Sequence, residues 1–326
     1  MTTTEGLLIA VRAVHFAATL ALFGEIVFAL LAAGRARSQA DAMLSGESCG
    51  AEQAGYCRTA IAAWLIAVVS ALCWMLLQTT LMSGRPLEAG WDVAVLRTVI
   101  ESTLFGRAWT VRALLALALA ALWLIARVGR VPQHRIAGAF AMVLAGAFVA
   151  GLAWAGHANM ESAADGAIHH LSDALHLLAA GVWLGGLAPL IATMRRLGRL
   201  PTQGELDSAS RVVVRFGTLA AACVGVLLAT GAVNARYTLR SPMALLDTPY
   251  GHLLLLKLIL FSLMLVIAAV NRARLTPGLC ARDDDLAARS AVARRLRRNA
   301  CAEQALGLLI LVLVGALGVS PPPMAT

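Results

Sequence analysis

The sequence predicts an all-α fold: a polytopic integral membrane helix bundle of about eight transmembrane helices, with both termini periplasmic. Three observations lead to this fold class: the composition, the number of long apolar runs and the distribution of arginine. The chain is 60% hydrophobic and 14% charged, with a mean hydropathy of +0.77, whereas soluble domains are about 45–50% apolar and about 25% charged. This composition excludes a soluble enzyme and favours lipid-exposed helices.

The apolar runs set the number of spans. A helix needs about 17–25 predominantly apolar residues to cross a bilayer. The first run is interpreted as a retained helix, because no cation precedes Arg12 and a secretory signal peptide begins with a basic segment. Eight runs of this kind lie near 6–33, 59–82, 108–127, 135–157, 169–193, 212–235, 251–271 and 301–319.

The cations orient these spans. The chain has 27 Lys and Arg against 18 Asp and Glu, and 19 of the 27 cations fall in one set of alternate loops, which the positive-inside rule assigns to the cytoplasm. An even number of spans then puts both termini outside. Because the net charge of +9 resides in gaps between apolar runs, it indicates membrane topology, and we expect no nucleic-acid partner.

Two segments between the spans have helical character of their own. Gly84-Arg85-Pro86 ends the second span, and the amphipathic spacing near 91–104 predicts a short helix at the outer interface. The segment 283–298 predicts a charged cytoplasmic helix, and we interpret it as an anchor near anionic membrane lipid in preference to a regulatory site. We expect an N-terminal three-helix half over 1–133 and a C-terminal five-helix half over 134–326.

Histidines mark the candidate site, because an ionisable group inside hydrocarbon costs about 2.5–3.5 kcal/mol and is a functional-site hypothesis by default. On this topology only His134 is cytoplasmic. His169, Asp173 and His176 occupy positions i, i+4 and i+7, which share one helix face. The other six histidines lie on the outer side: His15, His157, His169, His170, His176 and His252.

The types of side chain favour copper. Imidazole suits copper, zinc, iron and nickel, and thioether selects cuprous copper. Met160 lies beside the histidines, and Met75 and Met82 lie in the outer half of the second span. A single histidine at the membrane interface is explained more simply as a ring that lies partly in water at headgroup depth. Four histidines within twenty residues, in contrast, favour a metal site. The candidate metal ligands are His157, His176, His15, His169, His170, Met160, His252 and Asp173.

Other polar and small residues in the spans have simpler explanations. We expect Arg12 and Lys257 to pair with a carboxylate or reach the lipid surface, and we assign Gly185-Gly186 to close helix packing. The six cysteines form no C-x-x-C pair, so free thiols are favoured over a metal motif or a disulfide framework.

Beyond these patterns, six short motifs are spread over nearly the whole chain. They are Val14-His15-Phe16, Leu104-Phe105-Gly106-Arg107-Ala108-Trp109, His176 to Leu187 with Trp183 and Gly185-Gly186, Thr230-Gly231 to Asn234, Thr248 to Lys257 followed by Asn271-Arg272, and Leu296-Arg297-Arg298 to Glu303. Through these motifs the chain resembles the CopD family of copper-resistance membrane proteins over nearly its whole length.

The resemblance implies an inner-membrane protein of copper homeostasis that moves copper inward and works with a separate periplasmic partner of the CopC type. It also implies that His15, His157 and His176 are associated with copper, and His252 with less support. A haem-b electron-transfer bundle is the alternative, since facing transmembrane histidines can hold a haem. No P-loop occurs, and we expect a transport protein without enzyme activity.

Overall fold

The computed structural model describes residues 3–33, 48–84, 91–127, 134–155, 163–197, 201–239, 241–281, 285–321 and 323. Throughout these ranges the chain is helical and contains no strand. Eight of the described helices are long and apolar enough to cross a membrane, which confirms the predicted fold class and the number of spans.

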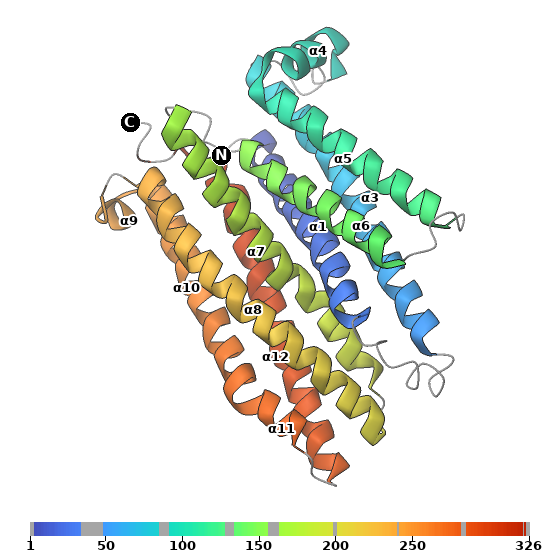
Figure 1. The fold of residues 1–326 in the computed structure, drawn as a ribbon. Helices are drawn as coiled ribbons and strands as arrows, with labels where there is room; N and C mark the ends of the chain where they lie inside the picture. Colours follow the sequence, from blue (N-terminus) through green and yellow to red (C-terminus); the bar gives the residue numbers. More distant parts are fainter. Residues whose placement is uncertain are drawn as a thin grey trace.

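The described helices form the bundle shown in Figure 1. The described elements are α1 (Thr3–Ala33), α3 (Ser48–Ser83), α4 (Val93–Ser102), α5 (Leu104–Arg127), α6 (His134–Ala150), the 3-10 turn η2 (Gly151–Ala155), α7 (Ala163–Arg196), α8 (Gln203–Thr238), α9 (Ala244–Asp247), α10 (Pro249–Val270), the π-helical turn η4 (Asn271–Leu275), α11 (Thr276–Cys280) and α12 (Leu286–Leu317).

Two helices begin earlier than the apolar runs indicate, because polar residues cap them. At the start of α8, Thr202 and Glu205 form a capping box: the Glu205 carboxylate accepts from Thr202 N at 2.7 Å, and Thr202 Oγ1 accepts from Glu205 N at 3.3 Å. Asp285 caps α12 by accepting from Ala288 N at 2.9 Å. Within the described residues, the charged segment predicted as a separate helix is therefore the first part of α12, continuous with the eighth span.

Figure 1 shows α1 near the centre of the bundle, with α3, α5 and α6 on one side and α7, α8, α10 and α12 on the other. Helix α1 packs against α3 and α6 and also against α7 and α12. It therefore contacts helices on both sides of the predicted division at residue 133, and that division stays a prediction. Along their spans, α1 and α7 are the most buried helices and α10 is the most exposed.

Small residues allow the two central helices to approach closely. A Cβ atom added to Gly24 would collide with the backbone of Gly185, and one added to Gly185 would collide with Leu20 O. The expectation that Gly185 serves packing is thus confirmed, since only glycine leaves room for the facing backbone. This contact fixes α7, which carries three of the candidate histidines, against α1, which carries a fourth.

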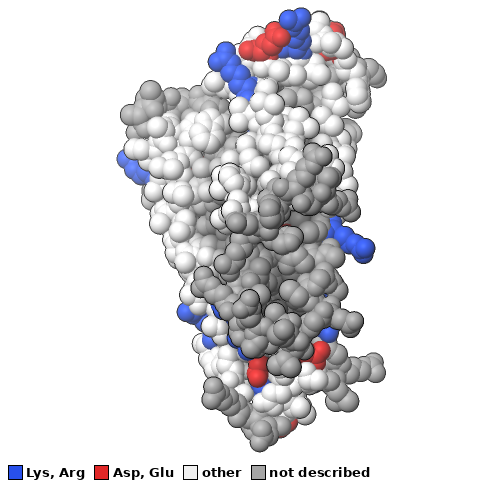
Figure 2. Space-filling model, turned by 45° about the vertical axis from the view of Figure 1, so that its right-hand side comes forward, with Lys and Arg blue, Asp and Glu red and all other residues white. Residues whose placement is uncertain are grey.

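The bundle has two distinct ends. The termini end is the one at which α1 begins and α12 ends, where α4 also lies in Figure 1. The arginine end is the opposite one, which holds α11 and the start of α12. In Figure 2 the charged side chains lie mainly towards the two ends of the visible face. The periplasmic location of the termini end follows from the arginine distribution and stays a prediction.

Helix α4 lies where the amphipathic short helix is predicted. Asp92 caps it by accepting from Ala94 N at 2.9 Å, and Arg97 and Glu101 form an exposed ion pair of 2.9 Å one turn apart. Gly84, with a φ of 64°, follows the end of α3, a conformation that glycine adopts without strain. The placement of α4 at the membrane surface stays a prediction.

Candidate metal centre

Most of the predicted histidines lie in the half of the bundle nearest the termini end. His15 is in α1, His169, His170 and His176 are in the first half of α7, and His252 is in the first turn of α10. The remaining predicted ligands, His157 and Met160, lie outside the described residues. The described histidines occupy two different environments, one centred on α7 and α8 and one on α1, α3 and α5.

The first environment fixes His176 in a defined tautomer. His176 Nδ1 lies 2.9 Å from Thr230 Oγ1, which itself donates its proton to Val226 O at 2.6 Å. Because Thr230 has only one hydroxyl proton, its oxygen accepts from His176, and Nδ1 carries the imidazole proton. Nε2 then carries the lone pair, and it has no hydrogen bond within the part of the chain that the structure describes. Neutral imidazole with a free Nε2 is the form that binds a metal.

Asp173 supplies a carboxylate beside this imidazole. Asn234 Nδ2 donates to Asp173 Oδ1 at 3.3 Å, and the carboxylate interacts electrostatically with His169, His170 and Lys257. No ion pair joins Asp173 and Lys257 among the described residues, so the pairing expected for this lysine stays a prediction.

His169 completes the face of α7 that meets α8. Its ring stacks on Tyr237, with 4.8 Å between ring centroids and 11° between the planes. Beside it, Ser172 Oγ donates to Thr230 O at 3.2 Å. These contacts hold α7 against α8, and they place His169, Asp173 and His176 along one seam, as the i, i+4 and i+7 spacing predicts.

The other two described histidines at this end have different contacts. His170 stacks on Trp154, with centroids 5.1 Å apart, and its Nδ1 lies 2.5 Å from Gly166 O. His252 is exposed, and its Nε2 lies 2.6 Å from Leu246 O. A carbonyl oxygen only accepts, so each of these ring nitrogens carries a proton and donates it.

His15 belongs to the second environment, and both of its ring nitrogens are used. Nδ1 lies 3.0 Å from Ala67 O and 3.0 Å from Ser70 Oγ, and Nε2 lies 2.8 Å from Arg112 Nη2. Because guanidinium only donates, Nε2 accepts and its lone pair is occupied. His15 is 0% exposed and Arg112 is 1% exposed. In this arrangement a metal cation would have to displace Arg112 to reach the imidazole.

Aromatic rings surround the two buried arginines of this second environment. The guanidinium of Arg112 lies 4.8 Å from the Trp109 ring and 4.4 Å from the Phe148 ring, and that of Arg12 lies 4.5 Å from the Trp74 ring. Neither arginine forms an ion pair with a carboxylate of the described residues. The expected carboxylate partner of Arg12 is therefore not found there, and the faces of the tryptophan rings meet the positive charges instead.

The described residues do not assemble a complete metal site. Within the described ranges, no group of three His, Cys, Asp or Glu side chains is placed to hold a metal ion. The structure brings together the seam residues of α7, whereas His15 has its hydrogen bonds to α3 and α5. Assignment of the full ligand set, including His157, Met160 and His252, stays a prediction.

Sequence reasoning gave too little weight to the polar partners that arrange these groups. Thr230 and Asn234 lie in an apolar helix, and only the tertiary contacts show that they orient His176 and Asp173. At the arginine end, Asn271 Nδ2 donates to the buried Glu303 at 2.7 Å, and Asn299 donates to Asn271 Oδ1 at 2.8 Å. The sequence signal that could have identified these partners is their position, because each is a polar residue inside an apolar run.

That polar group borders a cavity of about 360 Å³ between α7, α8, α10 and α12. Trp183 and Phe216 line its apolar part, and Asn271 and Glu303 line its polar end. The cavity and the seam lie towards opposite ends of α7.

Two models of protein families match this chain, one in each half. The model of the family described as copper resistance protein D matches residues 210–317, and that of the copper resistance protein D-like N-terminal domain matches residues 1–169. No solved structure matches.

Three relatives are similar in sequence. Copper resistance protein D of Pseudomonas syringae pv. tomato is 30% identical over 98% of this chain and 98% of its own length. Inner membrane protein YebZ of Escherichia coli (strain K12) is 30% identical over 77% of this chain and 83% of its own length. Copper transport protein CutJ of Bacillus subtilis (strain 168) is 29% identical over 76% of this chain, which spans 43% of that protein.

These matches account for the eight apolar helices as those of a multi-pass inner-membrane protein. The names of the relatives describe copper resistance and copper transport. With one family model matching more than half of the chain and a relative aligned from end to end, the chain belongs to the copper resistance protein D family.

Proposed function

We propose that this protein binds copper at the periplasmic side of the inner membrane and moves it inward. The observation that carries the proposal is the hydrogen bond from His176 Nδ1 to Thr230, which leaves the Nε2 lone pair available for a metal. Asp173, one turn before His176 on the same helix face, is a further oxygen donor. Family membership points to copper as the metal among those that imidazole binds.

The proposed ligand set begins with His176 and includes further donors from the same end of the bundle. His169 and Asp173 share its helix face, and His157 and Met160 precede it in the sequence as histidine and thioether donors. A separate periplasmic protein of the CopC type would deliver copper to this set. The driving force in this proposal does not come from nucleotide hydrolysis, since the sequence holds no P-loop.

Copper uptake into proteoliposomes tests this function directly. Vesicles that contain the protein should accumulate copper faster than empty vesicles, and vesicles that contain His176→Ala should resemble empty ones. The absorbance spectrum of the same purified protein tests the alternative, because a haem-b protein shows a Soret band and a copper transporter does not. A Soret band with no copper uptake would overturn the proposal.

The orientation is tested separately with reporter fusions. Fusions after Arg199 and within 283–298 should report a cytoplasmic location, and a fusion at Thr326 should report a periplasmic one, because 19 of 27 cations lie in one set of loops. A cytoplasmic C-terminus would put the His176 seam on the wrong side for periplasmic copper.

A further inference from the structure

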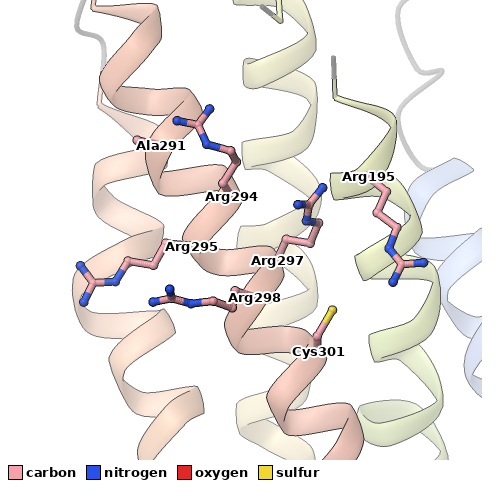
Figure 3. A pocket seen from close by; sticks show the side chains of 7 residues that line it. All are labelled: Arg195, Ala291, Arg294, Arg295, Arg297, Arg298 and Cys301. Carbon is pink, nitrogen blue, oxygen red and sulfur yellow. The ribbon is translucent and has the colours of Figure 1, made fainter. Parts of the chain in front are cut away.

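A second hollow lies at the arginine end, far along α7 from the histidine seam. Its volume is about 850 Å³, which lies in the range of roughly 300–1,000 Å³ typical of ligand pockets. Arg195 comes from the last turn of α7, and the other lining residues come from the first half of α12 (Figure 3). The lining residues are Arg195, Ala291, Arg294, Arg295, Arg297, Arg298 and Cys301.

The spacing on α12 places several of these residues on one face of the helix. Arg294, Arg297, Arg298 and Cys301 occupy positions i, i+3, i+4 and i+7, which share a helix face. Figure 3 shows Arg297 and Cys301 pointing towards the side on which Arg195 of α7 lies. The hollow is thus bordered by guanidinium groups from two helices that are distant in sequence.

Within the described ranges, no carboxylate is paired with any of the five arginines of this hollow. Among the residues that the structure describes, none of them makes a hydrogen bond or an ion pair. The contrast is Arg289, a little over one turn earlier on α12, which is buried and bonds Asp207 at 2.6 Å and Leu279 O at 3.1 Å. Clustered guanidinium groups repel one another, and an anion bound among them removes that repulsion. Guanidinium presents paired N–H donors that match the oxygens of a phosphate group.

The depth of the hollow in the membrane indicates the source of the phosphate. Helix α12 has 32 residues, which gives a length of about 48 Å, against about 30 Å for the hydrocarbon core. Its apolar run starts near Cys301, so Arg294, Arg297 and Arg298 lie within about 10 Å of the hydrocarbon boundary. The apolar part of α7 likewise ends just before Arg195. This is the level of the lipid headgroups.

We propose that this hollow binds the phosphate group of an anionic phospholipid. The lipid phosphate lies between Arg195 and the arginines of α12, and the acyl chains run along the apolar surface below. Basic pockets between transmembrane helices take anionic headgroups in this way. The bound lipid links the end of α7 to α12, so it stabilises the helix that carries His176 at its other end.

Thermal unfolding of the purified full-length protein in detergent tests this site. Phosphatidylglycerol should raise the Tm of the wild type in a saturable manner, and phosphatidylcholine, which has no net charge, should raise it much less. In Arg195→Gln/Arg297→Gln the apparent Kd for phosphatidylglycerol should weaken about tenfold or more. The matched control is Arg58→Gln/Arg211→Gln, which removes the same charge from exposed arginines outside the hollow and should bind like the wild type.

Three results would overturn the proposal. Equal phosphatidylglycerol binding by both double variants would show that the lipid acts through general surface charge. An equal Tm shift from inorganic phosphate would assign the hollow to a soluble anion and not to a lipid. If Arg195→Gln/Arg297→Gln does not fold, Arg294→Gln/Arg298→Gln replaces it, and native mass spectrometry counts the phosphatidylglycerol retained by each variant; unchanged retention would again contradict the site.

Discussion

His15 and His176 look alike in the sequence, since each is a histidine in an apolar span near the same end of the bundle, but the structure gives them opposite surroundings. His176 donates from Nδ1 to Thr230 and lies near the carboxylate of Asp173. His15 donates from Nδ1 to Ala67 O or Ser70 Oγ and accepts from Arg112 at Nε2.

The difference teaches what makes an intramembrane imidazole able to bind a cation. A histidine needs a hydrogen-bond partner on one nitrogen that leaves the lone pair of the other free, and it needs nearby negative charge. His176 has both. His15 has a guanidinium on the lone pair, and a second arginine, Arg12, lies over Trp74, whose ring contacts that of His15.

The largest expected effect comes from removal of the His176 ring. His176→Ala should lower copper affinity by about 100-fold or more, because loss of a ligand exceeds the 10–100-fold cost of losing a partner that only orients a ligand. Isothermal titration with copper measures this, and His134→Ala, at the opposite end of the bundle, is the control. Equal losses of copper affinity in His176→Ala and His134→Ala would contradict a copper site at the termini end.

The next largest expected effect comes from competition between protons and copper for the imidazole nitrogens. A metal-binding imidazole must be neutral, so copper affinity should fall as the pH falls through the ordinary imidazole pKa. Between pH 7 and pH 5, a ligand imidazole that is exposed to water in the metal-free protein and has the ordinary pKa of about 6.5 weakens binding about 25-fold. Titrations at several pH values should show more than one proton displaced per copper. A flat profile would exclude exposed imidazoles as the main ligands and leave buried imidazole or the thioethers of Met75, Met82 and Met160.

Loss of the tautomer partner should have a smaller effect than loss of the ring. Thr230→Val removes the hydroxyl that holds His176 Nδ1, and copper affinity should fall about tenfold or somewhat more. Thr218→Val is the matched control, since Thr218 is in the same helix and bonds only Val214 O among the described residues. Similar affinities for both variants would mean that Thr230 does not prepare His176 for copper.

The smallest expected effect on copper is that of His15→Ala. This change leaves the buried Arg112 donor and Ala67 O without the imidazole, which costs about 1–3 kcal/mol of folding free energy. The Tm should fall while copper affinity changes less than about threefold, a difference under about 1 kcal/mol. A loss of copper affinity as large as that of His176→Ala would assign His15 to the copper site, as the family resemblance implies.

Much of the architecture can be predicted from the sequence for a simple physical reason. Hydrocarbon forces each span to satisfy its own backbone hydrogen bonds, so a long apolar run becomes a helix whatever surrounds it. The eight runs, the helix after Asp92 and the close packing at Gly185 are local consequences of composition, capping and side-chain size.

The function of each polar group could not be predicted in the same way. Whether His176 exposes a lone pair depends on Thr230, 54 positions away, and whether His15 loses one depends on Arg112, 97 positions away. The sequence by itself determined a membrane bundle with histidines gathered near one end. The tertiary structure alone decided which imidazole faces a hydroxyl and a carboxylate and which faces a guanidinium, because hydrogen-bond direction and charge depend on neighbours that helix packing brings together.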